Sequence, residues 1–322
     1  MPSIFPPALF DRRLNIFLLI TVFILTLIYL FPLPLPLLHP TTSLTTREQP
    51  RWLIATISPA LSQRRRNIIR TTWQSLYTGP PADFRFILAN PGIEWYDVIT
   101  AENNTHGDLI MLDHLTEGKA LGMMTKEIDF ALWLVESGRQ YNFVSKLDDD
   151  SYLDGNAFYD EYLSHRVEQG LQPTVEESVI IGRHMGRDGF ISEQYPFPYP
   201  GGQFWTMSWP VISALARQYN TSSTRAHWAD VLIGKLLDEA GTEFNFVDMP
   251  HSEAFEYRED IDDEEEWEHV ITSKSMNPHL LKEDELYLKV AGQMRSVGAR
   301  RKWWKDERKW EWTTERDDGK RR

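Results

Sequence analysis

The sequence predicts an α/β domain with a mixed, mostly parallel central sheet, because short apolar runs alternate with segments of helical periodicity. Runs rich in β-branched and aromatic residues occupy residues 51–58, 84–89, 108–112, 141–147, 178–182 and 243–247. Apolar residues recur at helical spacing over residues 62–76 and 117–138, and from 229 onward. Parallel sheets bind ligands at the carboxyl ends of their strands, so polar residues at those ends are candidate site residues.

The composition of the 322-residue chain is that of a folded protein, with 42% hydrophobic and 25% charged residues. Its formal net charge of -13 argues against nucleic acid as a main partner, because phosphate binding requires a basic surface. There is no cysteine, so no disulfide stabilises the domain. No repeat of fixed period is present, which disfavours a solenoid.

Residues 14–31 carry no charged side chain, and this length suffices to cross about 30 Å of hydrocarbon as a helix. Arg12 and Arg13 precede the stretch and no charge follows before Arg47, so the positive-inside rule places the N-terminus in the cytosol. We therefore predict a single-pass type II membrane protein with its signal-anchor at 14–31. A cleaved signal peptide and a buried core helix are the alternatives.

The predicted membrane anchor sets the organisation of the rest of the chain. Residues 1–13 form a cytosolic tail, and residues 32–50, rich in proline and threonine, form a stem. The main luminal domain is predicted over 51–298, and a charged tail with four tryptophans over 299–322. The triplets that begin at Asn103 and Asn220 match the N-glycosylation pattern and agree with a luminal location.

Three consecutive carboxylates, Asp148, Asp149 and Asp150, directly follow the apolar run 141–147. Carboxylates this close repel one another and raise each other's pKa, a cost that a bound cation removes. Magnesium-like ions commonly bind through one or two carboxylates together with substrate phosphates. We therefore interpret Asp148 and Asp150 as a clamp for a metal ion and a diphosphate. An aspartate-rich turn or helix start is the alternative.

Three further features could belong to the same site. Asp230 lies in the first turn of a predicted helix, where it stays ionised and could act as a base, although charge compensation at a helix start is the simpler explanation. His251 could complete a metal shell, although a lone histidine is more often a satisfied polar residue. Residues 195–208, YPFPYPGGQFWTMS, are expected to form a rigid loop that either admits a ligand or covers a core.

Taken in order, these motifs resemble glycosyltransferase family 31, the β-1,3-galactosyltransferase and fringe-like group. The basic helix RRRNIIRTTW (64–73) and the metal motif FVSKLDDDSYL (143–153) are similar to motifs of that family. So are GDLIMLD (107–113), the loop 195–208 and ADVLIG (229–234). Each motif is weak by itself, but the ordered series is specific.

The resemblance implies a GT-A fold and an inverting hexosyltransferase. Such an enzyme moves a sugar of the galactose or N-acetylhexosamine type from a UDP-sugar to a glycan hydroxyl in a β-1,3 linkage. The implied cofactor is Mn²⁺ or Mg²⁺, and the implied location is the Golgi or ER membrane with the catalytic domain in the lumen.

The resemblance also implies roles for individual residues. Asp150 would bind the metal directly, with His251 as a second ligand, and Asp230 would be the catalytic base. Asp148 and Asp149 would contact the donor or a metal-bound water. By their places in the same motifs, further donor contacts are expected from Arg66, Arg70, Lys119 and Lys146, and acceptor contacts from Tyr199, Gly201, Gly202 and Trp205.

The sequence departs from the family pattern in three places. Ala229 replaces the glutamate before the base, Ala89 replaces a glycine, and the cysteines common in animal members are absent. Gly118-Lys119 is similar to a pair in fungal relatives, which points to a divergent fungal-type branch. Because of Ala229, a catalytically inactive glycan-binding or scaffolding module is the first alternative. A metal-dependent phosphohydrolase is the second, and it leaves Asp230 unexplained.

Overall fold

The computed structural model describes residues 52–118, 120–167, 177–186, 195–224, 228–259 and 268–317. The chain divides into two units, Met1–Gln49 and Pro50–Arg322, and all described residues belong to the second. The predicted cytosolic tail, membrane helix and stem therefore lie outside the described residues. Within the described ranges, no helix combines the length and the apolar character needed to cross a bilayer.

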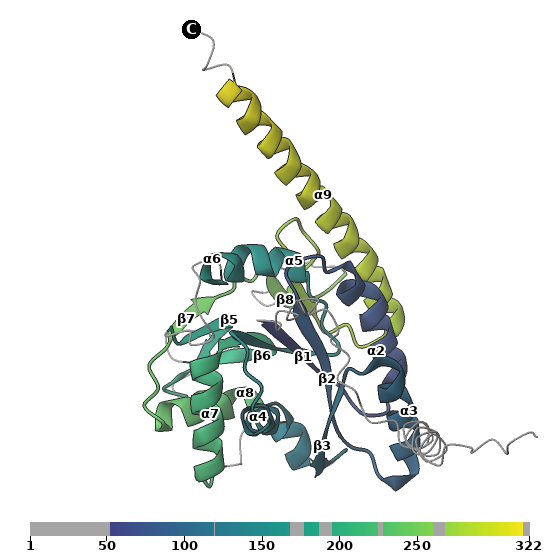
Figure 1. Cartoon of the computed structure of the whole chain (residues 1–322), viewed down its shortest axis with the longest axis vertical. Helices are drawn as coiled ribbons and strands as arrows, with labels where there is room; N and C mark the ends of the chain where they lie inside the picture. The colour runs from purple at the N-terminus through teal and green to yellow at the C-terminus, as the bar shows by residue number, and fades with distance from the viewer. Residues whose placement is uncertain are drawn as a thin grey trace, which may run out of the picture. The chain divides into compact units, whose positions relative to one another are not determined.

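A seven-stranded sheet forms the centre of the second unit, with strand order β3-β2-β1-β4-β6-β5-β7 (Figure 1). Neighbouring strands are parallel except at β6, which is antiparallel to both β4 and β5. The strands are β1 (Trp52–Ile57), β2 (Ala82–Asn90), β3 (Leu109–Thr116), β4 (Phe143–Asp148), β5 (Val179–Gly186), β6 (Pro198–Ser208) and β7 (Asn245–Asp248). The predicted α/β sheet is confirmed, and each predicted apolar run overlaps one of these strands.

Strand β6 corrects the prediction of a loop over residues 195–208. Its second half, from Phe204 to Ser208, pairs with β4 in the middle of the sheet. Pro198 and Pro200 lie in its first half, which pairs only with β5. A strand in the middle of a sheet forms backbone hydrogen bonds with a neighbouring strand on each side. Proline has no N–H to donate, so it is tolerated where a neighbouring strand is missing on one side. The two prolines favour a loop in the sequence, but in the structure they lie in the half of β6 that extends past β4.

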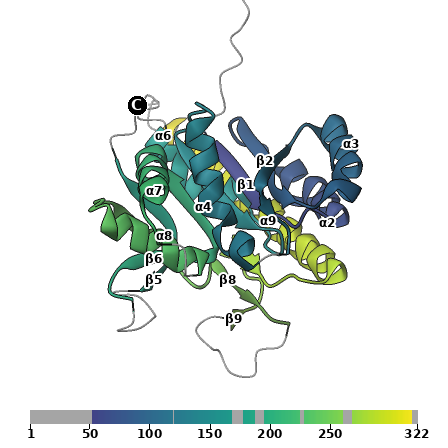
Figure 2. The ribbon, with the colours of Figure 1, turned by 90° about the horizontal axis from the view of Figure 1, so that it is seen from below.

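Helices cover both faces of the sheet, because alternate residues of each strand point to opposite faces (Figures 1 and 2). On one face, α4 (Ala120–Glu136), α7 (Trp209–Thr221) and α8 (Ala229–Glu239) pack around buried strand residues such as Leu53, Val144 and Trp205. The other face packs around Ile54, Phe86 and Phe143. Its helices are α2 (Gln63–Ile69), η1 (Arg70–Gln74), α3 (Tyr96–His106), α5 (Gly155–Phe158), η3 (Tyr159–Leu163) and α9 (Asp284–Asp317).

The remaining described elements are short. They are η2 (Ile93–Trp95), α6 (Ser164–Val167) and a three-stranded sheet of β10 (Asn277–His279), β8 (Ala254–Tyr257) and β9 (Glu268–His269). Helix α9 begins beside α2 and continues past residue 299, where the sequence predicted a charged tail to begin (Figure 2).

A buried cluster of charges joins α2 and η1 to α3. Arg66 Nη2 lies 2.6 Å from Glu102 Oε2, and both side chains are fully buried. Arg70 reaches Glu102 and Asp108, each at 2.8 Å. Burial alone would raise the pKa of Glu102, but the hydrogen bonds and charges of Arg66 and Arg70 outweigh it and hold that pKa below its usual value.

Replacement of Glu102 by glutamine should lower the free energy of unfolding by about 3 kcal/mol, because it leaves the buried Arg66 charge uncompensated. Urea denaturation measures this change. The exposed Glu136 on α4 is the control, and Glu136→Gln should stay within about 0.5 kcal/mol of wild type.

The same pair of proteins tests the pKa of Glu102. A carboxyl whose folded-state pKa is lowered stabilises the fold above its unfolded-state pKa, and this contribution is lost as the pH falls through the folded-state value. The difference in unfolding free energy between wild type and Glu102→Gln should therefore shrink below about pH 4. A difference that does not change with pH would contradict an ionised Glu102.

Candidate metal and active site

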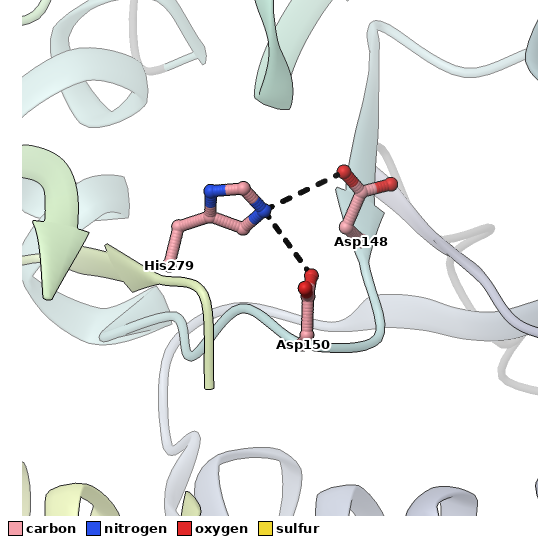
Figure 3. Close-up of side chains that lie close together, drawn as sticks. All are labelled: Asp148, Asp150 and His279. Atoms are coloured by element: carbon pink, nitrogen blue, oxygen red, sulfur yellow. Dashed lines mark ion pairs between the residues drawn. The ribbon is translucent and has the colours of Figure 1, made fainter. Parts of the chain in front are cut away.

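Two carboxylates and one imidazole converge at the carboxyl end of β4 (Figure 3). Asp148 is the last residue of β4, Asp150 follows it in the next turn, and His279 ends β10. Each offers one ligand atom, and these atoms all lie within 4.8 Å of one another. His279 Nε2 is 3.2 Å from Asp150 Oδ1 and 4.0 Å from Asp148 Oδ2. This spacing allows all three to bind one cation.

Backbone hydrogen bonds bring His279 to the aspartates. Tyr152 N donates to Pro278 O (3.0 Å), and Leu281 N donates to Asp150 O (2.9 Å). The aspartate turn and the histidine segment are therefore joined on both sides of His279. Between these bonds, Leu280 has a φ of 64°, the sole positive φ among the described non-glycine residues. Such strain persists only where surrounding contacts hold it, and it often accompanies functional sites.

Arg65 fastens the aspartate turn to the start of α9. Its Nη1 donates to the carbonyls of Asp149 (3.1 Å) and Leu281 (2.7 Å), its Nη2 to that of Lys282 (2.6 Å) and its Nε to Asp284 (2.8 Å). Its guanidinium also stacks over the ring of Tyr287, at 4.8 Å from the centroid. One buried arginine thus bonds to both segments that carry the candidate ligands.

A second group of charges lies beside Asp148. Lys146 Nζ is 2.8 Å from Asp148 Oδ1 and 3.5 Å from Glu127 Oε2, and it donates to the carbonyl of Gly202. Asp230, in the first turn of α8, lies against the same glycine, since a Cβ at position 202 would be 3.8 Å from its Oδ2. Strand β6 thereby places Gly202 next to Lys146 and Asp230.

Burial is the largest single influence on the pKa of Asp230, Asp149 and Asp150. Burial raises the pKa of Asp230, with a smaller contribution from Asp148, while the backbone N–H of Val231 and the charge of Lys146 oppose it. Burial also raises the pKa of Asp149 to about 6, although Ser58 Oγ donates a 3.0 Å hydrogen bond to it. For Asp150 burial acts in the same direction, but the hydrogen bond and charge of His279 outweigh it and lower the pKa.

Several expected site residues lie elsewhere. Arg66 and Arg70 belong to the buried cluster with Glu102, and Arg66 has no exposed surface, so direct donor contacts do not fit their placement. Trp205 points into the core on the α4, α7 and α8 face and is fully buried, which does not fit an acceptor contact. Its indole Nε1 donates to Glu127 Oε2 at 3.0 Å, so the side chain is bonded within the protein.

The other expected residues have mixed placements. His251 is not part of the cation group; its Nδ1 lies 3.3 Å from Arg183 Nη2. Tyr199 is buried against Tyr195, with ring centroids 6.0 Å apart, and Gly201 lies against Arg183. Lys119 lies outside the described residues. The glycosylation candidates Asn103 and Asn220 are exposed, on α3 and α7.

Sequence reasoning missed two residues that the structure places at the site. His279 lies in the segment NPHLL, and the acids that follow it are typical of a helix start, so the segment gives no specific signal of a metal ligand. Glu127 occupies a buried position of α4, and its Oε2 lies 3.5 Å from Lys146 Nζ. An acid at a buried helix position is rare without a partner, and that rarity is the signal that could have found it.

Comparison with known proteins gives a family match over more than half of the chain. The family model described as galactosyltransferase matches residues 64–246. No curated protein matches the sequence.

Solved structures that resemble the chain include an active-site mutant of LgtC, with 8% identity, a TM-score of 0.42 and coverage of 77% of this chain and 95% of that one. The mannosyltransferase PcManGT from Pyrobaculum calidifontis, in complex with GDP-Man and Mn²⁺, has 12% identity, a TM-score of 0.36 and coverage of 62% and 55%. A glycosyltransferase involved in glycosylation of the major capsid of PBCV-1 has 8% identity, a TM-score of 0.39 and coverage of 77% and 100%.

Replacement of Arg65 by lysine should lower the free energy of unfolding by about 2 kcal/mol, because buried carbonyl acceptors lose the planar donor that serves them. It should also weaken binding of Mn²⁺, measured by titration calorimetry, because the two backbone hydrogen bonds alone hold the histidine segment to the aspartate turn less firmly. The neighbouring Arg64, with 74% of its side chain exposed, is the control. Equal losses of stability and of Mn²⁺ affinity in Arg64→Lys and Arg65→Lys would contradict the role of Arg65 in joining the two segments.

Proposed function

The chain belongs to the galactosyltransferase family, and from that premise we propose that it is a metal-dependent inverting glycosyltransferase of GT-A type. The proposed reaction moves a sugar of the galactose or N-acetylhexosamine type from a UDP-sugar to a glycan hydroxyl and forms a β-1,3 linkage. The observation that carries the proposal is the convergence of Asp148, Asp150 and His279 near the half-buried carboxylate of Asp230.

The three converging side chains fit a divalent cation. Carboxylate oxygens suit magnesium and manganese, and an imidazole nitrogen favours a transition metal, so this donor set favours Mn²⁺ over Mg²⁺. Asp148, Asp150 and His279 would hold the ion, and the remaining positions would be filled by the donor diphosphate. When bound, the ion supplies Lewis-acid stabilisation of the departing diphosphate.

Asp230 is the residue of this chain proposed to move the proton. A half-buried carboxylate with a raised pKa is a stronger base than a fully exposed one, which suits removal of a proton from an acceptor hydroxyl. Gly202 has no side chain, so the space beside Asp230 stays open for the acceptor. As the hydroxyl oxygen bonds to the anomeric carbon, the bond to the diphosphate breaks, and this single displacement inverts the anomer.

The first alternative remains an inactive glycan-binding module of the same fold, which Ala229 favours. The two functions differ in a simple measurement, because a binding module releases no UDP from a UDP-sugar in the presence of Mn²⁺.

We also propose that the protein is a single-pass type II protein of the Golgi or ER membrane. The uncharged stretch 14–31 supports the anchor, and the exposed positions of Asn103 and Asn220 agree with a luminal domain.

Replacement of Asp230 by asparagine should lower the rate of sugar transfer by about 10² to 10⁴, the usual contribution of a general base. The melting temperature and the binding of UDP with Mn²⁺ should be unchanged, because asparagine keeps the size of the side chain. A variant that transfers sugar at the wild-type rate would exclude Asp230 as the base.

Replacement of His279 by alanine should weaken Mn²⁺-dependent binding of UDP at least about tenfold, because a ligand is lost. Asp150→Ala should have a similar effect. His251→Ala is the matched control, and it should leave the affinity unchanged, because His251 lies against Arg183. Titration calorimetry measures the affinity of all three variants for UDP in the presence of Mn²⁺. A loss of affinity in His251→Ala but not in His279→Ala would identify His251, and not His279, as the metal ligand.

A further inference from the structure

Lys146 lies between two carboxylates, and only one of them belongs to the candidate metal group. Its Nζ is 2.8 Å from Asp148 Oδ1 and 3.5 Å from Glu127 Oε2. Lys146 and Glu127 each have only 5% of their side-chain surface exposed. The pair is therefore shielded from water, where charges interact most strongly and where an uncompensated ion is costly.

The groups that face this pair come from three elements. Strand β4 contributes Asp148, and β6 contributes the Gly202 carbonyl and the indole of Trp205, whose Nε1 donates to Glu127 Oε2 at 3.0 Å. Helix α8 contributes the charge of Asp230. The ammonium of Lys146 thus contacts the carboxylates of Glu127 and Asp148 and is also influenced by the charge of Asp230.

The charge of each partner depends on the other. Burial alone would lower the pKa of Lys146, but the charges of Asp148 and Glu127 and the hydrogen bond to Asp148 outweigh it and raise that pKa. Burial raises the pKa of Glu127, and the charge of Lys146 is the main influence that opposes this rise. Lys146, at 3.5 Å, is thus the cation that the buried Glu127 faces.

Two positive charges compete for Asp148 in the proposed function. An ammonium 2.8 Å from a carboxylate that also binds a divalent ion would be repelled by that ion, and it would draw the carboxylate away from it. A second carboxylate within reach of the same ammonium removes this conflict, because it gives Lys146 a partner that binds no metal.

We propose that Glu127 is a positioning residue that acts through Lys146. Its carboxylate balances the buried ammonium, so that Asp148 can direct its own carboxylate to a divalent cation. This inference rests on the proposed function, because it assigns Glu127 a task only if the site binds a cation.

The test is the affinity of the full-length protein for Mn²⁺ in the presence of UDP, measured by titration calorimetry. Glu127→Gln keeps the shape of the side chain and an oxygen that accepts from Trp205, and it removes only the charge. We expect this variant to bind Mn²⁺ about tenfold or more weakly, the usual effect of losing a residue that supports a ligand.

Asp129→Asn is the matched control on the same helix. Asp129 is also a buried acid, but its partners are His114 (3.1 Å) and Tyr219 (3.1 Å), away from Lys146. Its replacement should lower the melting temperature and leave the Mn²⁺ affinity unchanged. An equal loss of affinity in both variants would mean a general loss of stability and would overturn the proposal.

A double variant separates charge balance from simple packing. If Glu127 acts through Lys146, then Lys146→Met added to Glu127→Gln removes the uncompensated ammonium and should restore most of the lost affinity. A double variant no better than Glu127→Gln would overturn the proposal, as would wild-type affinity in Glu127→Gln. Wild-type protein that binds no Mn²⁺ at all would overturn both this role and the proposed metal-dependent function.

Discussion

The pairing between the aspartate turn and the histidine segment is the interaction on which the candidate site depends. His279 meets Asp150 because Leu281 N and Tyr152 N bond across the two segments. Arg65 holds both segments with one guanidinium, so the geometry does not depend on a single contact. The left-handed Leu280 is tolerated because these bonds fix the chain on either side of it.

The one antiparallel strand of the main sheet gives the site its second half. Because β6 runs against β4, its first residues extend past the carboxyl end of β4 and bring Gly202 over Lys146. Helix α8 follows on the same face and places Asp230 against that glycine. Through Gly202, the antiparallel strand therefore links Lys146, which lies 2.8 Å from Asp148, to the proposed base Asp230.

The buried charges around Arg66 are connected to the aspartate turn near the end of β1. The structural network of Arg66, Glu102 and Arg70 fixes α2 and η1 on α3, and Arg66 Nη1 lies 3.4 Å from Ser58 Oγ. Ser58 Oγ in turn donates to Asp149. Disruption of the structural network would therefore affect the aspartate turn through the hydroxyl of Ser58. Arg66 and Arg70 can influence the site in this way without contact to a substrate.

The sequence by itself determined the features that depend on neighbouring residues. Apolar runs located β1 to β5 and β7, and the aspartates and Asp230 were placed correctly at the end of β4 and in the first turn of α8. Only the tertiary structure decided that His279 faces the aspartates and that Glu127 pairs with Lys146. It also decided that Arg65, and not Arg66, bonds to the aspartate turn, at the carbonyl of Asp149. Each of those outcomes depends on contacts between segments far apart in the chain, and local periodicity carries no record of which buried charges will meet.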